Sequence, residues 1–314
     1  MDFTPEPYDA ATASKWLVCR TCSTQFPTDD RSAVTTCHIC DDARQYVPPT
    51  GQSFTTLADL ARTHRNTFTT YPPDPRITFI ETTPRLAIGQ RAALIKTPQG
   101  NVLWDCIALL DDDTVQRVRE MGGLKAIVIS HPHYYTTHVH WARAFGCPVY
   151  LAAEDQEWTT MSSTHTQLLT QTETEIVQGS GVRAIKLGGH FPGSLVLLFE
   201  GRLFVADTLV TTPSGLGDWT VDGNGAARQG GNGRPPGSNS YAFMWSIPNM
   251  IPLGVEELAR MWDVLSRYEF RATHGAFRSM DVEDEGVKGR VLESMQIQAR
   301  FMGHDKHPLV SARV

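Results

Sequence analysis

The 314-residue sequence lacks an apolar run of the length that a transmembrane helix needs. Its first residues, MDFTPEPYDAATASKW, also lack the basic and apolar blocks of a signal peptide and the arginines of a transit peptide. Basic residues are not in excess, because 34 Asp and Glu outnumber 28 Lys and Arg and the net charge is −6. We therefore expect a cytoplasmic protein that binds neither a membrane nor a nucleic acid.

The sequence also lacks internal repeats, and its composition is that of a globular protein, with 41% hydrophobic and 20% charged residues. Its length allows one large core and a small appendage. The segment YVPPTGQS interrupts regular structure and predicts a linker. We expect an N-terminal tail over 1–15, a small metal-binding unit over 16–50 and one large domain over 51–314.

Cysteine is scarce outside one short region, where four of the six cysteines form two CxxC pairs. Cys19 and Cys22 make the first pair, and Cys37 and Cys40 follow after fourteen residues. Two such turns can place four thiolates around one tetrahedral ion, and the unit resembles a zinc ribbon or rubredoxin-like knuckle. We expect Zn²⁺ there, with iron as the alternative ion and a redox dithiol as the alternative role.

Short β-type runs separated by turn residues begin at Ile77 and continue through most of the chain. Helical patterns lie between and after them, most regularly over 111–121, 255–268 and 287–302. This alternation predicts an α/β (α+β) fold in which sheets pack on each other and helices cover them. A loop dense in Gly, Pro, Asn and Asp is expected over 211–239, and the aromatic segment after it can line a pocket or fill the core.

Residues able to ligate a metal follow several of the predicted strands. His131 and His133 end one strand, and in an extended loop alternate side chains point the same way. His190 lies in the loop GGHFPG, Asp207 ends the strand RLFVAD, and His274 ends another strand near the C-terminus. Such residues at neighbouring strand ends predict one shared metal site.

This series resembles the metallo-β-lactamase superfamily over roughly residues 77–280. The resemblance implies an αββα sandwich in which His131, His133 and His190 bind the first metal. It also implies that Asp207 is a bridging carboxylate and that His274 is a ligand of a second metal. Asp105, at the end of an early strand, matches a residue that supports the metal loop in the family.

The sequence departs from the family pattern HxHxDH at its last two positions, where Tyr135 and Thr136 stand. Those positions normally supply second-metal ligands and the Asp that orients the attacking water. Two remaining protein ligands make a poor zinc site, so we expect a single metal. His138 and His140 lie just beyond, and one of them could swing in as a substitute ligand; we expect both to lie on the following helix, which would turn them away from the site.

The resemblance implies a metal-dependent hydrolase acting on a small molecule, and we expect an ester, thioester or lactone substrate. Zn²⁺ is the expected ion, with iron as the alternative. Asp207 would be a fourth ligand or the general base, and Tyr134 or Tyr135 would donate a proton. The alternatives are an iron oxygenase of sulfur substrates, similar to persulfide dioxygenases, and a non-catalytic scaffold that binds a partner through the cysteine unit. The oligomeric state does not follow from the sequence.

Overall fold

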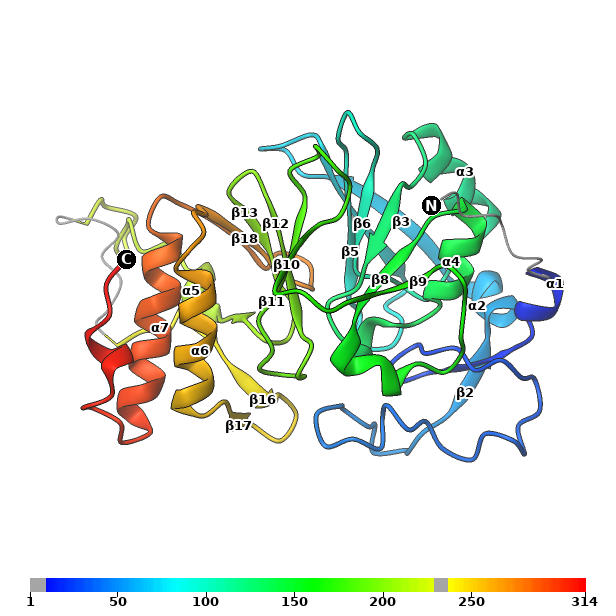
Figure 1. The fold of residues 1–314 in the computed structure, drawn as a ribbon, viewed down its shortest axis with the longest axis horizontal. Coiled ribbons are helices and arrows are strands. Elements are labelled where there is room, and N and C mark those ends of the chain that lie inside the picture. The colour runs from blue at the N-terminus through cyan, green and yellow to red at the C-terminus, as the bar shows by residue number, and fades with distance from the viewer. Residues whose placement is uncertain (1–9, 229–236) are drawn as a thin grey trace.

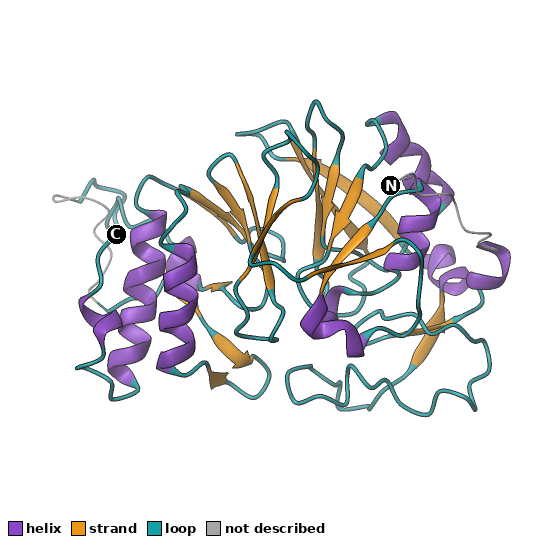
Figure 2. Ribbon diagram, viewed as in Figure 1, coloured by secondary structure: helices purple, strands orange, loops and turns teal. Residues whose placement is uncertain are grey.

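Apolar runs form two β-sheets that pack face to face in the computed structural model, which describes residues 10–228 and 237–314. Helices cover the outer face of each sheet, with α3 and α4 on one side and α6 and α7 on the other (Figures 1 and 2). The predicted αββα sandwich is therefore confirmed. No helix of the described residues has the length and apolarity to cross a membrane.

The larger sheet has seven strands in chain order and changes from antiparallel to parallel at β6. Two helices, α3 (Asp112–Glu120) and α4 (His138–Phe145), make the first two parallel crossovers. The carboxyl ends of β6 and β7 therefore meet at one edge of the sheet. The strands are β3 (Arg65–Thr70), β4 (Ile77–Thr83), β5 (Arg91–Ile95), β6 (Val102–Trp104), β7 (Ala126–Val128), β8 (Val149–Ala152) and β9 (Thr166–Leu169).

The smaller sheet has six strands, in the order β10-β11-β12-β13-β18-β19. Its parallel pair is β13 and β18, in which Phe204 lies opposite His274. The loops that follow these strands leave the sheet in the same direction. The strands are β10 (Glu173–Glu175), β11 (Arg183–Lys186), β12 (Leu195–Phe199), β13 (Arg202–Phe204), β18 (Ala272–His274) and β19 (Asp281–Glu283).

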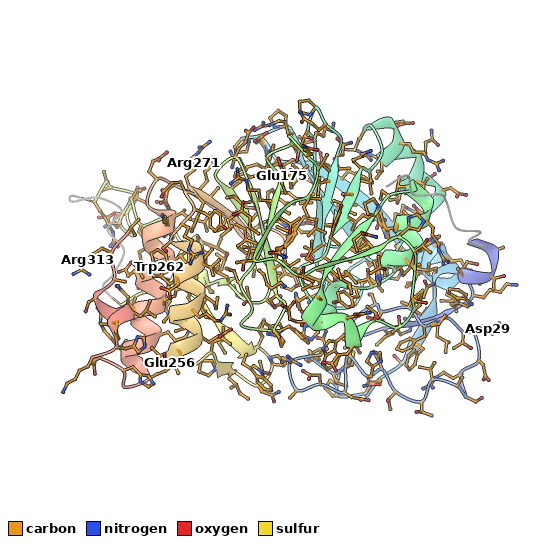
Figure 3. All side chains as sticks on the ribbon, viewed as in Figure 1. Asp29, Glu175, Glu256, Trp262, Arg271 and Arg313 are labelled. Atoms are coloured by element: carbon orange, nitrogen blue, oxygen red, sulfur yellow. The ribbon has the colours of Figure 1, made fainter. Side chains whose placement is uncertain are left out.

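Helix periodicity in the sequence corresponds to buried faces in the structure. Helix α6 (Val255–Leu265) buries five apolar residues at helical spacing against the smaller sheet and α7 (Val287–Phe301): Val255, Leu258, Met261, Trp262 and Leu265. Each such side chain contributes about 1.5–3 kcal/mol when it leaves water. Glu256 in the first turn is exposed (Figure 3).

Helix α3 shows how local sequence sets an element's ends. The Asp111 side chain accepts a hydrogen bond from the Thr114 amide at 2.9 Å, which satisfies a free amide at the helix start. The chain leaves the helix at Gly122, whose φ of 108° favours glycine. The helix predicted from an Asp-rich start and a Gly-Gly stop is confirmed.

The cysteine unit begins on a strand that pairs with residues after position 50. Strand β1 (Leu17–Cys19) pairs with β2 (Phe54–Thr56), which runs directly into α2 (Leu57–Thr63). Within the segment predicted as a tail, α1 (Ala10–Ala13) is a short helix and Ala13 is buried; residues 1–9 lie outside the described part. Figure 1 places this unit beside the larger sheet, at the end away from α6 and α7.

Residues 229–236 of the predicted 211–239 loop lie outside the described residues. In the aromatic segment that follows, Tyr241 and Phe243 are buried in the core that α6 and α7 share with the smaller sheet. The remaining elements are η1 (Pro132–Tyr134), η2 (Ala153–Trp158), β14 (Val210–Thr211), α5 (Pro213–Leu216), β15 (Tyr241–Ala242), β16 (Met244–Ser246), β17 (Ile251–Pro252) and η3 (Pro308–Ser311).

Candidate metal centres

The four cysteines of the two CxxC pairs converge on one point, and all four are buried. The Cys19 and Cys40 sulfurs are 3.7 Å apart, and those of Cys22 and Cys37 are 3.6 Å apart. These separations are far too long for disulfides. A tetrahedral ion with metal–sulfur bonds of about 2.3 Å requires sulfurs about 3.8 Å apart. The geometry therefore fits one tetrahedral ion.

The first two histidines leave the carboxyl end of β7 in a tight turn. His131 is extended, but Pro132–Tyr134 form the 3-10 turn η1, so the predicted extended loop is wrong. The two rings still meet, with centroids 4.9 Å apart, because His131 turns Nε2 and His133 turns Nδ1 towards the same point. Despite the turn, one nitrogen of each ring therefore faces the same oxygen, Asp207 Oδ2.

Two glycines bring His190 into the same place. Gly188 and Gly189 have φ values of 67° and 85°, and a side chain on Gly189 would collide with the Thr208 hydroxyl. That hydroxyl donates to the Gly188 carbonyl at 2.5 Å and accepts from the His190 amide at 3.3 Å. Because Thr208 directly follows Asp207, these bonds tie the His190 loop to the loop that carries Asp207.

Three imidazole nitrogens face one carboxylate oxygen. From Asp207 Oδ2, His131 Nε2 is 3.5 Å away, His133 Nδ1 is 3.7 Å away and His190 Nε2 is 3.9 Å away. His190 Nε2 and His133 Nδ1 are 3.3 Å apart. Metal bonds of about 2.0–2.1 Å place tetrahedral ligand atoms about 3.4 Å apart, so these donors fit a single ion.

Neighbouring groups hold the ligand side chains in orientation. His131 Nδ1 is 2.9 Å from the Ser130 hydroxyl, and His190 Nδ1 is 3.2 Å from the Met244 carbonyl. The Tyr134 hydroxyl donates to Asp207 Oδ1 at 2.7 Å, which leaves Oδ2 for the ion. Such outer contacts fix imidazole tautomers and carboxylate direction in metal sites.

Burial sets the charge of the cluster. Desolvation lowers the pKa of His133 and of His190 to about 4, so both imidazoles are neutral at pH 7 and able to ligate. Burial alone would raise the pKa of Asp207, but the side-chain contacts with His131 and then His133 hold it well below its usual value. Burial raises the pKa of Tyr134, which therefore remains a hydrogen-bond donor.

The metal loop is supported from β6 by Asp105, as the family resemblance implies. Its Oδ1 accepts a hydrogen bond from the Ser130 amide at 2.7 Å. Burial raises the pKa of Asp105 to about 8. The bond fixes the residue immediately before His131.

Tyr135 and Thr136 supply nothing to the cluster. The hydroxyl of Tyr135, one of the two predicted proton donors, donates to the Asp155 carbonyl at 3.1 Å. Thr136 has a φ of 41°, and its carbonyl accepts a hydrogen bond from the Gln25 amide of the cysteine unit. In the part of the chain that the structure describes, no further His, Cys, Asp or Glu joins the four ligands.

His274, which the family resemblance implies is a second-metal ligand, lies outside the four-residue cluster. Its Nδ1 is 2.8 Å from Asp281 Oδ1, and its ring packs 4.8 Å from those of Tyr71 and Phe204. The β13–β18 register puts His274 opposite Phe204, three residues before Asp207, where its side chain enters the core between the sheets.

The predicted helix that carries His138 and His140 is α4, and neither imidazole joins the cluster. His138 Nδ1 is 2.8 Å from the Tyr135 carbonyl, and the ring is buried.

Aromatic and cationic residues that were not predicted from the sequence surround the ligands. Phe191 lies 5.7, 5.0 and 5.2 Å from the rings of His131, His133 and His190. The Arg44 guanidinium lies 3.7 Å from the centre of the Phe191 ring. Phe191 directly follows the predicted ligand His190, so the sequence could have indicated it as a neighbour of the site. Arg44 is 146 residues from His190 along the chain, and no sequence pattern marks it.

Comparison with known proteins agrees with this geometry. The model of the metallo-beta-lactamase superfamily matches residues 88–247. An uncharacterized protein of Bacillus subtilis strain 168, YmaE, is 33% identical over 281 residues, which cover 87% of this chain and 93% of YmaE.

A solved structure shows the same fold. The metallo-beta-lactamase DIM-1 is 14% identical with a TM-score of 0.52, over 74% of this chain and 98% of its own. The mono-zinc form of FIM-1 from Pseudomonas aeruginosa is 13% identical with a TM-score of 0.48, over 75% of this chain and 96% of its own. The match to the family model, the relationship to YmaE and the αββα sandwich together show that this chain belongs to the metallo-beta-lactamase superfamily.

Proposed function

We propose that the protein is a metal-dependent hydrolase that acts on a small-molecule ester, thioester or lactone at a mononuclear site. The observation that supports this proposal is the convergence of three imidazole nitrogens on Asp207 Oδ2 at tetrahedral spacing. No additional ligand joins them among the described residues. A single ion, with Zn²⁺ as the first expectation and iron as the alternative, matches this donor set.

A bound ion would lower the pKa of a coordinated water and polarise a substrate carbonyl. The chain's own residues determine how that chemistry is held. The imidazoles of His131, His133 and His190 are neutral at pH 7, so each has a nitrogen lone pair that can bind a metal. Asp207 Oδ2 faces the three imidazole nitrogens at 3.5, 3.7 and 3.9 Å, which suits a ligand of the same ion. We therefore assign Asp207 as the fourth ligand, with its Oδ1 held by Tyr134.

His131, His133, His190 and Asp207 would hold the ion, and the ion would supply its Lewis-acid chemistry only where a water or a substrate carbonyl can reach it. Arg44, Phe191 and the indoles of Trp158 and Trp245 surround this region. They would limit access to a small molecule, and their apolar faces favour an apolar group beside the scissile carbonyl.

The test combines elemental analysis with a panel of esters, thioesters and lactones. We expect about two metal ions per chain, one in each cluster. His133→Ala should lose one ion and all hydrolysis above background. His138→Gln is the matched control, because His138 is equally buried in the same region and ligates nothing; it should retain both ions and the activity.

Three or more ions per chain would contradict the mononuclear assignment, and activity that persists in His133→Ala would contradict the site. Iron in the His/Asp site together with oxygen uptake on a thiol or persulfide substrate would favour the oxygenase alternative. Full metal loading without turnover on any substrate would favour a non-catalytic scaffold.

A further inference from the structure

We propose that the four-cysteine unit positions the His/Asp centre, and that Arg44 is the residue through which it acts. An ion bound by the cysteines would then increase the metal affinity of the His/Asp centre. The inference rests on metal binding at that centre, as proposed above, but not on the reaction catalysed there. Three sets of contacts carry it.

The first set is made by Arg44 itself, four residues after Cys40. Its Nη1 donates to the His190 carbonyl at 3.2 Å, and its guanidinium lies over the Phe191 ring. Asp42 holds the guanidinium in a two-point pair, with Nε–Oδ1 at 2.6 Å and Nη2–Oδ2 at 2.9 Å. The Arg44 and Asp42 side chains are only 11% and 17% exposed, so the pair is little screened by water. Arg44 is therefore rigidly held against the loop that carries a ligand.

The second set ties the same segment to the other side of His190. The Ala43 carbonyl accepts hydrogen bonds from Ser246 Oγ and Asn249 Nδ2, both at 2.6 Å. Two residues before Ser246, the Met244 carbonyl accepts from His190 Nδ1. His190 is thus fixed through its backbone by Arg44 and through its imidazole by a strand that Ala43 anchors.

The third set reaches the other ligands. His38, inside the second CxxC pair, stacks on Trp158 at 6.2 Å, and Trp158 lies 5.5 Å from Phe191. Phe191 in turn contacts all three histidine rings. Near the first CxxC pair, the Gln25 amide donates to the Thr136 carbonyl at 3.1 Å, in the loop that carries His131 and His133.

The segment that carries Arg44 depends on the cysteine knuckle for its shape. The amides of Cys40 and Asp41 both donate to the Cys37 carbonyl at 2.9 Å. Gln52 accepts from the Cys37 amide at 2.6 Å and donates to Asp41 Oδ1 at 2.7 Å. Small cysteine knuckles fold only with their ion. Loss of that ion would release 41–46 and, with it, the contacts to His190. By linkage, the effect is reciprocal between the two sites.

Arg44→Gln tests the proposal with Co²⁺ as the probe. Cobalt bound by cysteines gives intense sulfur-to-metal absorption, whereas cobalt bound by His and Asp gives only weak ligand-field bands, so the sites are read separately. Competition with a chelator then gives the Co²⁺ affinity of each of the two sites. We expect Arg44→Gln to weaken Co²⁺ binding at the His/Asp centre about 10–100-fold, as for other outer contacts, and to leave the cysteine site unchanged.

Arg31→Gln is the matched control. Arg31 belongs to the same unit and lies 4.5 Å from the centre of the Phe54 ring, but its hydrogen bonds go to Val34 and Thr35 within the unit. It should leave both affinities unchanged. Arg44→Lys should not restore the affinity, because an ammonium cannot form the two-point pair with Asp42. Unchanged or tighter binding in Arg44→Gln would overturn the proposal, since removing a cation that acted only by charge would strengthen metal binding.

Cys40→Ser supplies a second measurement. If Arg44 is the main route, Cys40→Ser weakens the His/Asp centre by a larger factor in the wild type than in the Arg44→Gln background, where only the contacts of Ala43, His38 and Gln25 remain. Equal effects in both backgrounds would overturn the route through Arg44. If Cys40→Ser does not fold, the Co²⁺ affinity of the His/Asp centre in Arg44→Gln tests the proposal by itself. A wild-type protein that binds cobalt only at the cysteines would instead refute the proposed function.

Discussion

Replacing Tyr134 by Phe removes a single hydrogen bond from the His/Asp centre. The Tyr134 side chain is fully buried, and its hydroxyl donates to Asp207 Oδ1 at 2.7 Å. Phe keeps the ring, which packs 4.6 Å from His131, so the substitution creates almost no cavity. Asp207 Oδ1 is left without this donor, and the carboxylate becomes free to rotate.

The magnitude follows from the charge of the acceptor. A hydrogen bond to a charged group is worth about 1.5–3 kcal/mol, and about 1.4 kcal/mol corresponds to a factor of ten in an equilibrium constant. Because the ion binds the oriented carboxylate, most of this free energy should appear in metal binding. We expect Tyr134→Phe to weaken Zn²⁺ binding at this centre about 10–100-fold.

Tyr135→Phe is the control for this prediction. Tyr135 is the next residue and is equally buried, but its hydroxyl donates to a neutral carbonyl away from the site. Its loss should reduce the free energy of unfolding by about 0.5–1.5 kcal/mol and leave zinc affinity unchanged. Chelator competition and urea unfolding measure the two effects. Unchanged zinc affinity in Tyr134→Phe, or an equal loss in Tyr135→Phe, would refute the reasoning.

Three further predictions concern residues around the two clusters. His274→Gln should keep both ions and reduce the free energy of unfolding by about 1–3 kcal/mol, because His274 pairs with Asp281 in the core; loss of an ion in elemental analysis would contradict its placement. Cys37→Ser should lose the cysteine-bound ion, whereas Cys147→Ser, which removes a buried thiol outside the cluster, should keep it. Burial lowers the pKa of His138 to about 4, so the unfolded chain takes up its proton first as the pH falls. The metal-free protein should therefore lose stability between about pH 6.5 and 4, and His138→Gln should reduce the slope by about 1.4 kcal/mol per pH unit; an identical slope in unfolding titrations would contradict this.

Local signals were sufficient for much of the fold. The Asp-rich start of α3 and the apolar spacing of α6 predicted these helices because capping and amphipathic burial act over a few neighbouring residues. The same is true of the CxxC pairs, since each turn brings two thiols together within four residues.

The sequence by itself determined the two ligand sets, with one exception. Strand ends and glycine loops placed His131, His133, His190 and Asp207 together, because β7 of the larger sheet and β11 and β13 of the smaller sheet end on the same side of the sandwich. His274 also ends a strand, yet the β13–β18 register turns it into the core. Register depends on pairing between distant segments, which no local pattern contains.

Only the tertiary structure decided what surrounds the ligands. Tyr134 and Tyr135 are adjacent in the sequence, and the 3-10 turn η1 sends one hydroxyl to Asp207 and the other to the Asp155 carbonyl. The contact between Arg44 and His190 joins residues 146 positions apart. It exists because the cysteine unit packs beside the larger sheet. Ligand identity is a property of short motifs, whereas ligand orientation and coupling between sites depend on packing between segments that are far apart in the chain.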